Sequence, residues 1–147
     1  MLDDLGILPT IHWHCKEFQK IYPNIRIETS LCTQQERLAE PLEITIFRIL
    51  QEAMHNAAKH SNADLIRIAL ESESGIHLII EDNGTGFDLK EATAGKSRLN
   101  GMGLSSMKER AELSGGKLYI ESIRGVGTTI RASWPAGPVS RDRTEES

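Results

Sequence analysis

Four polar side chains between residues 41 and 60 have the types and the spacing needed to handle a metal-bound anion. Glu52 and Asn56 are four residues apart, so on a helix they lie on the same side. Lys59 and His60 follow one turn later. An amide oxygen is a hard ligand that suits Mg²⁺, a neighbouring carboxylate can orient water, and a lysine can meet phosphate as a point charge. Taken alone, the same residues also fit a solvated helix edge with one Glu–His pair.

A second group of candidate residues follows an expected strand, in the run Asp82-Asn83-Gly84-Thr85-Gly86. A carboxylate at the end of a strand can accept a hydrogen bond from an exocyclic amine such as N6 of adenine. Gly84 and Gly86 allow the backbone to approach a ligand closely. By itself the run is equally compatible with an ordinary Asn–Gly turn.

Two further glycine-containing motifs lie closer to the C-terminus. Gly101-Met102-Gly103-Leu104 stands where a loop enters a helix, and free backbone N–H groups there suit phosphate. Gly127 and Thr128 open the last expected strand, where the Thr128 hydroxyl could support Asp82 or the edge of a base. Without the other motifs, these two are a common loop–helix junction and a hairpin turn.

The elements that must position these residues are predicted from hydrophobic periodicity and turn signals. Short links between consecutive strands favour antiparallel pairing, with helices on one face. We therefore predict an α/β two-layer sandwich of the α+β type, with a mixed, mostly antiparallel sheet covered on one face by helices. Residues 82–103 have little periodicity and are predicted as a mobile loop. The predicted helices span 9–21, 41–60 and 104–113, and the predicted strands span 25–29, 65–70, 76–81, 117–122 and 128–134.

In their order and spacing, the motifs resemble the Bergerat-type ATP-binding fold shared by histidine kinases, gyrase-type topoisomerases, Hsp90 and MutL. The resemblance covers nearly the whole chain up to Pro135. The matching motifs are an N box, two glycine boxes and a closing motif: Glu52-x-x-x-Asn56 with Lys59-His60, Asp82-x-Gly84-x-Gly86, Gly101-x-Gly103-Leu104, and Gly127-Thr128.

One branch of that family is favoured, the histidine kinases that partner response regulators with helix-turn-helix output domains. The resemblance to this branch rests on the run Met107-Lys108-Glu109-Arg110-Ala111, on Gly115-Gly116, and on residues 5–9, which are similar to the branch's opening segment. The resemblance implies three regions. Residues 1–22 would be the end of a dimerisation helix, its linker and an opening helix, 23–135 the catalytic ATP-binding domain, and 136–147 a disordered tail.

The resemblance also implies roles for single residues, with ATP as substrate and Mg²⁺ as cofactor. Asn56 would ligate Mg²⁺, and Asp82 would read adenine with support from Thr128. Lys59 and His60 would face the phosphates. Glu52 activates water in relatives that hydrolyse ATP, whereas transfer to histidine has no obvious need for that water. The residues that would shape the pocket and a lid over residues 87–101 are Gly84, Gly86, Gly101, Gly103 and Leu104.

Composition limits the partners and the compartment. The net charge of −4 offers no basic surface for direct nucleic-acid binding. No apolar run approaches the roughly 20 residues that span a bilayer. Cys15 and Cys32 lack CxxC spacing and indicate two buried or idle thiols in a reducing cytoplasm. The resemblance implies a homodimeric parent protein, cytoplasmic or anchored in the inner membrane. Its partners would be its own histidine-bearing dimerisation domain, absent here, and a response regulator with a helix-turn-helix output domain.

Two other functions remain open, an anti-sigma-type serine kinase and a non-catalytic, nucleotide-gated interaction module. The opening segment argues against the first, because a stand-alone kinase has no use for a linker remnant. In the favoured branch an acidic residue directly follows the phospho-accepting histidine, and none of the five histidines here has one. The chain is therefore expected to bind Mg-ATP without phosphorylating itself.

Overall fold

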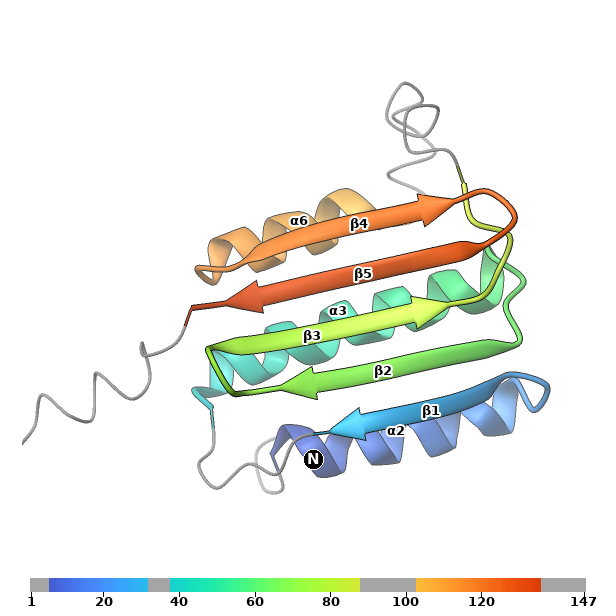
Figure 1. The fold of residues 1–147 in the computed structure, drawn as a ribbon. Coiled ribbons are helices and arrows are strands. Elements are labelled where there is room, and N and C mark those ends of the chain that lie inside the picture. The colour runs from blue at the N-terminus through green and yellow to red at the C-terminus, as the bar shows by residue number, and fades with distance from the viewer. Residues whose placement is uncertain (1–5, 32–37, 88–102, 136–147) are drawn as a thin grey trace, which may run out of the picture.

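Five strands form one mixed sheet in the order β1-β2-β3-β5-β4 (Figure 1). The computed structural model describes residues 6–31, 38–87 and 103–135. β1 runs parallel to β2, and the other neighbouring strands pair antiparallel. The strands are β1 (Arg26–Leu31), β2 (Leu65–Glu71), β3 (Ile76–Asp82), β4 (Lys117–Ile123) and β5 (Gly127–Trp134).

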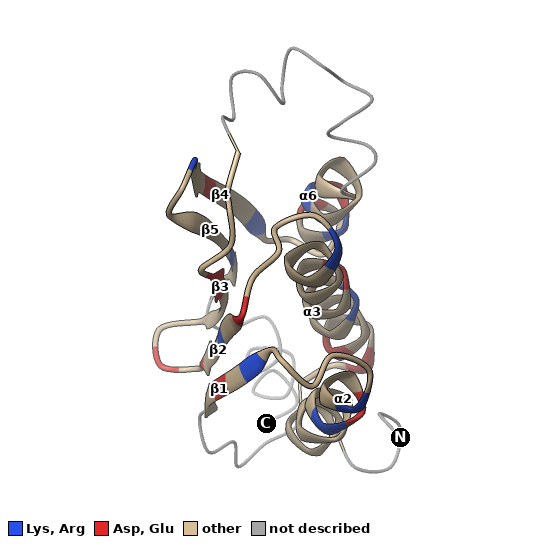
Figure 2. Cartoon of the chain, turned by 90° about the vertical axis from the view of Figure 1, so that its right-hand side faces the viewer, with Lys and Arg blue, Asp and Glu red and all other residues tan. Residues whose placement is uncertain are grey.

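Three described helices cover one face of this sheet and leave the other face open (Figure 2). They are α2 (Ile7–Ile21), α3 (Glu40–Lys59) and α6 (Leu104–Leu113). The predicted α/β two-layer sandwich with a mostly antiparallel sheet is confirmed. Within the described ranges, no helix is long and apolar enough to cross a bilayer.

The apolar core lies between the two layers, because each element buries one side. On α3, Ile46, Ile49 and Ala53 recur at helical spacing and are buried. On β2, Ile66 and Ile68 alternate with exposed polar residues, as expected for a strand with one buried face. Burial on both sides of the interface is what orients the helix against the sheet.

Some element bounds differ from the predicted ones. α2 begins at Ile7 rather than Pro9, since a proline within the first helical turn gives up no intrahelical hydrogen bond. β3 extends one residue further than predicted and includes Asp82, because Asp82 pairs with Thr128 of β5. The side-chain direction of Asp82 is therefore set by the sheet and not by a loop.

α2 belongs to the same core as the sheet. Ile7, Ile11 and Phe18 are buried on its inner side and join the cluster that α3 and the strands form. Among the described residues, the packing is continuous across the boundary suggested after residue 22.

The end of α6 is tied to the last residue of β5. The indole Nε1 of Trp134 donates a hydrogen bond to Ser114 Oγ at 2.8 Å. Gly116 lies so close to the same indole that a Cβ there would fall 2.6 Å from its Cδ1 atom. The turn after α6 thus holds that end of the helix against the sheet.

Candidate functional site

Asp82 closes β3 on the side that faces the helices. Its side chain shares that side with Leu78 and Ile80, which are buried. One carboxylate oxygen, Oδ1, accepts a hydrogen bond from the backbone N–H of Gly84 at 2.8 Å. A carboxylate has further lone pairs, so Asp82 can still accept from a ligand amine.

Burial raises the pKa of the Asp82 carboxyl above its ordinary value. Backbone hydrogen bonds from Gly84 and Thr128 oppose that rise, and the neighbouring charge of Glu81 adds slightly to it. Burial of the ionised carboxylate therefore lowers the stability of the protein without a ligand. A cost of this kind is typical of functional carboxylates in clefts.

The first glycine box packs on the C-terminal end of α3. The N–H of Thr85 donates to the Ser61 carbonyl at 2.7 Å, and the Ser61 N–H donates to the Asn56 carbonyl at 3.1 Å. Gly84 lies against Ser61, where a Cβ would collide with the Ser61 carbonyl. These contacts place the turn that follows Asp82 beside the last turn of the helix that carries Asn56.

The second glycine box meets the same helix one turn earlier. Gly103 adopts φ +69°, and a Cβ there would fall 2.7 Å from the carboxyl carbon of Glu52. Leu104, the first residue of α6, is buried. Among the described residues, no side chain caps this N-terminus or accepts from its first backbone N–H groups as a cap would. Gly101 and residues 88–100 of the predicted lid lie outside the described residues.

The N box residues divide between two environments. Asn56 is 6% exposed and its amide oxygen is buried. Glu52 is half-buried against Gly103 and lines a polar hollow of about 410 Å³ between α3 and α6, together with Arg48, His55 and Arg110. Asn56 therefore belongs to the interior between helix and sheet, and Glu52 to its rim.

Lys59 and His60 are exposed at the end of α3. The Lys59 ammonium lies 5.7 Å from the centre of the Tyr22 ring, on the α2 side of the helix. The His60 ring lies 6.2 Å from the ring of His55. That these two side chains face the phosphates stays a prediction.

Thr128 lies beside Asp82, and its hydroxyl contacts a third side chain. The backbone of Thr128 is what hydrogen-bonds Asp82. Its Oγ1 lies 2.8 Å from Ser122 Oγ on β4. Sequence reasoning missed Ser122. The signal available was the alternation along β4, which puts Ser122 on the same side as Leu118 and Ile120.

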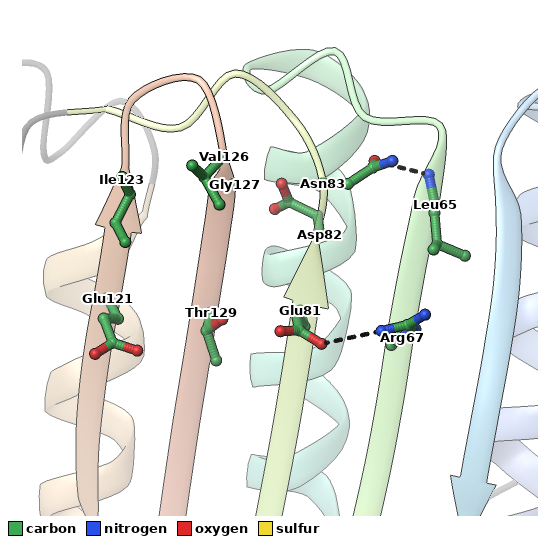
Figure 3. Close-up of a pocket in the computed structure, with 10 residues that line it drawn as sticks. All are labelled: Leu65, Arg67, Glu81, Asp82, Asn83, Glu121, Ile123, Val126, Gly127 and Thr129. Carbon is green, nitrogen blue, oxygen red and sulfur yellow. Dashed lines mark hydrogen bonds and ion pairs between the residues drawn. The ribbon is translucent and has the colours of Figure 1, made fainter.

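A separate hollow of about 310 Å³ lies on the open face of the sheet, opposite the helices (Figure 3). Two of its charged groups, Arg67 and Glu81, are paired with each other, and Asp82 and Glu121 line it as well. Arg67 lies 3.9 Å from Glu81 and donates to Glu28 at 3.0 Å. Because the Asp82 side chain alternates with core residues and Asn56 is buried beneath the sheet, we assign the candidate site to the helix-facing side.

The described residues hold no group of three or more His, Cys, Asp or Glu able to bind a metal ion. Mg²⁺, however, keeps several waters and commonly takes one or two protein ligands together with substrate phosphates. The buried amide oxygen of Asn56 fits that pattern. The site therefore suits a divalent ion that arrives with a phosphorylated ligand.

Residues 42–138 match the family model described as histidine kinase-, DNA gyrase B-, and HSP90-like ATPase. The signal transduction histidine-protein kinase/phosphatase DegS of Bacillus subtilis (strain 168) is 39% identical over 137 residues, which are 91% of this chain and 35% of that protein. The oxygen sensor histidine kinase NreB of Staphylococcus carnosus (strain TM300) is 32% identical over 135 residues, which are 91% of this chain and 38% of that protein. The chain thus spans little more than a third of the length of these relatives.

Two solved structures share the fold. The histidine kinase domain of the blue-light activated histidine kinase EL346 from Erythrobacter litoralis matches 88% of this chain and 59% of that chain, with a TM-score of 0.68 and 18% identity. The ATP binding domain of PrrB from Mycobacterium tuberculosis matches 83% of this chain and 88% of that chain, with a TM-score of 0.58 and 24% identity.

Proposed function

The chain belongs to the family of histidine kinase-, DNA gyrase B- and HSP90-like ATPases, and from this premise we propose that it is the Mg-ATP-binding catalytic domain of a two-component sensor histidine kinase. The observation that carries the proposal is Asp82, a partly buried carboxylate held at a strand end beside the helix that bears Asn56. The two backbone hydrogen bonds to this carboxylate offset the cost of its burial only in part, and a ligand amine would offset more of it.

Each part of the site has a role in this proposal. Asp82 accepts a hydrogen bond from the exocyclic amine of adenine. The Asn56 amide oxygen holds Mg²⁺, which when bound neutralises charge on the phosphates. The uncapped backbone N–H groups at the start of α6 suit phosphate oxygens, with the helix dipole adding to the attraction. Glu52, at the rim beside Gly103, orients groups around the metal.

The phosphoryl acceptor would be a histidine on a dimerisation domain of the parent protein. The protein contribution to transfer would be positioning and charge stabilisation, because phosphoryl transfer requires little covalent chemistry from the enzyme. An aspartate of a response regulator with a helix-turn-helix output domain would then receive the group. The parent protein would be a homodimer with this domain in the cytoplasm.

Nucleotide identity tests the proposal. Guanine presents a carbonyl where adenine presents an amine, so Asp82 would face an acceptor instead of a donor. Titration calorimetry in the presence of Mg²⁺ should show ATP binding at least about tenfold tighter than GTP, about 1.4 kcal/mol. Equal affinities for ATP and GTP would remove Asp82 from base recognition, and no binding of either would contradict the proposed function.

A further inference from the structure

Three polar side chains form one row across three neighbouring strands. Asp82 on β3 pairs with Thr128 on β5, and Thr128 pairs with Ser122 on β4. All three are on the helix-facing side. The next row on that side is apolar throughout, with Ile80, Ile130 and Ile120 in register. The polar row therefore marks the sheet's end at the candidate site.

Ser122 Oγ has three neighbours and one proton. It accepts a hydrogen bond from the backbone N–H of Phe87 at 2.8 Å. Thr128 Oγ1 lies 2.8 Å away, and the Gly127 carbonyl lies 3.4 Å away. The shorter distance is the usual one for an O–H···O hydrogen bond, in which either hydroxyl can donate; in the arrangement that a ligand acceptor beside Thr128 would favour, the Ser122 proton goes to Thr128 Oγ1. Thr128 then keeps its own proton to donate elsewhere.

We propose that Ser122 is a positioning residue for the nucleotide base, which it serves by anchoring the backbone at Phe87 and by making the Thr128 hydroxyl a donor. The proposal rests on the proposed function. The edge of adenine presents an amine beside a ring nitrogen that accepts, so it fits an acceptor, Asp82, beside a donor, Thr128. Hypoxanthine presents a carbonyl beside a ring N–H and fits the opposite arrangement.

Additional backbone contacts hold this row in place. The N–H of Gly125 donates to the Thr85 carbonyl at 2.6 Å, which ties the β4–β5 turn to the first glycine box. Gly86 and Gly127 lie against the carbonyls of Ile123 and Asp82, closer than any Cβ would allow. Ser122 thus acts between two segments whose backbones are already in contact.

The test compares Ser122→Ala and Ser122→Thr with Ser133→Ala. Ser133 lies on β5 at the opposite end of the sheet, where it pairs with Lys117. Mg-ATP and Mg-ITP affinities are measured by competition with a fluorescent ADP analogue.

Losing one hydrogen bond in Ser122→Ala should weaken ATP binding about fivefold to tenfold and reduce the preference for ATP over ITP. Exchange of the Phe87 amide should become faster in the same variant. Ser122→Thr should keep all three properties, and Ser133→Ala should change none.

The outcomes separate this inference from the proposed function. If the wild-type chain binds Mg-ATP but Ser122→Ala keeps its affinity and its ATP preference, the positioning role is wrong and the proposed function stands. A weaker affinity with an unchanged ATP preference would show a purely structural role and would also overturn it. If the wild-type chain binds no ATP, the proposed function fails first. Should the alanine variant not fold, Ser122→Cys gives the same comparison, because a thiol keeps the size of the side chain and is a poor donor.

Discussion

Replacing Asp82 by asparagine is expected to weaken ATP binding about a hundredfold, since a hydrogen bond to a charged acceptor is lost and an amide takes its place. The same change should make the empty protein more stable at neutral pH. Burial raises the pKa of the Asp82 carboxyl, which means that the folded state disfavours its ionised form. Asparagine carries no charge that has to be desolvated.

The direction of the Asp82 pKa shift determines how the stability difference between Asp82→Asn and the wild type depends on pH. Because the folded-state pKa lies above the unfolded value of 3.8, the carboxyl stabilises the fold fully only below that value. Its contribution is lost as the pH rises through the folded-state pKa. The difference in thermal midpoint between Asp82→Asn and the wild type should therefore be small near pH 3 and grow toward neutral pH. Calorimetric or circular-dichroism melts between about pH 3 and pH 8 measure it.

Glu81→Gln is the matched control for this prediction. Glu81 is the neighbouring acid on the same strand, but its side chain lies on the open face and contacts Arg67 (Figure 3). Its replacement should leave ATP affinity unchanged. Asn56→Ala offers a second comparison, because it should weaken Mg-ATP binding without affecting metal-free adenosine. An Asp82→Asn variant that bound ATP as tightly as the wild type would contradict the assigned role.

The second large effect concerns phosphorylation. With ATP labelled on its γ-phosphate, the isolated chain is expected to incorporate no label. His77 lies in β3, and one of its ring nitrogens is 3.1 Å from the Ser74 carbonyl. His14 is packed edge-on against the ring of Phe47. The remaining histidines, His12, His55 and His60, are exposed but precede Trp13, Asn56 and Ser61 instead of an acid.

Adding the dimerisation domain of the parent protein should produce acid-labile label on that domain. Asn56→Ala is the control, since without the Mg²⁺ ligand the mixture should stay largely unlabelled. Stoichiometric label on any histidine of the isolated chain would overturn the prediction. Absence of label with the dimerisation domain present, despite measured ATP binding, would favour the nucleotide-gated interaction module over a kinase.

Local patterns predicted most of the fold. The helix over residues 104–113 has the predicted bounds, because a periodic segment ends at Ser114-Gly115-Gly116. The strands were recognisable from alternation between buried and exposed positions. The order of the strands was not, since β5 lies between β3 and β4 through contacts between segments far apart in the sequence. The parallel pairing of β1 with β2 likewise depends on where α3 crosses the sheet.

The candidate site shows the same limit. Asp82, Gly84 and Gly103 were predicted from their types and spacing, and the structure brings their segments to the same helix. The partner of Thr128 could not be predicted, because it depends on the register between β4 and β5. The position of Lys59 over Tyr22 depends on how α2 packs against α3. Spacing along one helix therefore indicates which side chains are candidates, but not which neighbour each will contact.

The two tryptophans give the chain a natural optical signal for one of its internal contacts. Trp134 is 3% exposed and hydrogen-bonded to Ser114 at the end of α6, whereas Trp13 on α2 is 47% exposed. A buried indole fluoresces at shorter wavelengths than an indole in water. Separation of the end of α6 from β5 would therefore shift the Trp134 emission to the red and leave that of Trp13 nearly unchanged, so a change at this junction can be followed without attaching a dye.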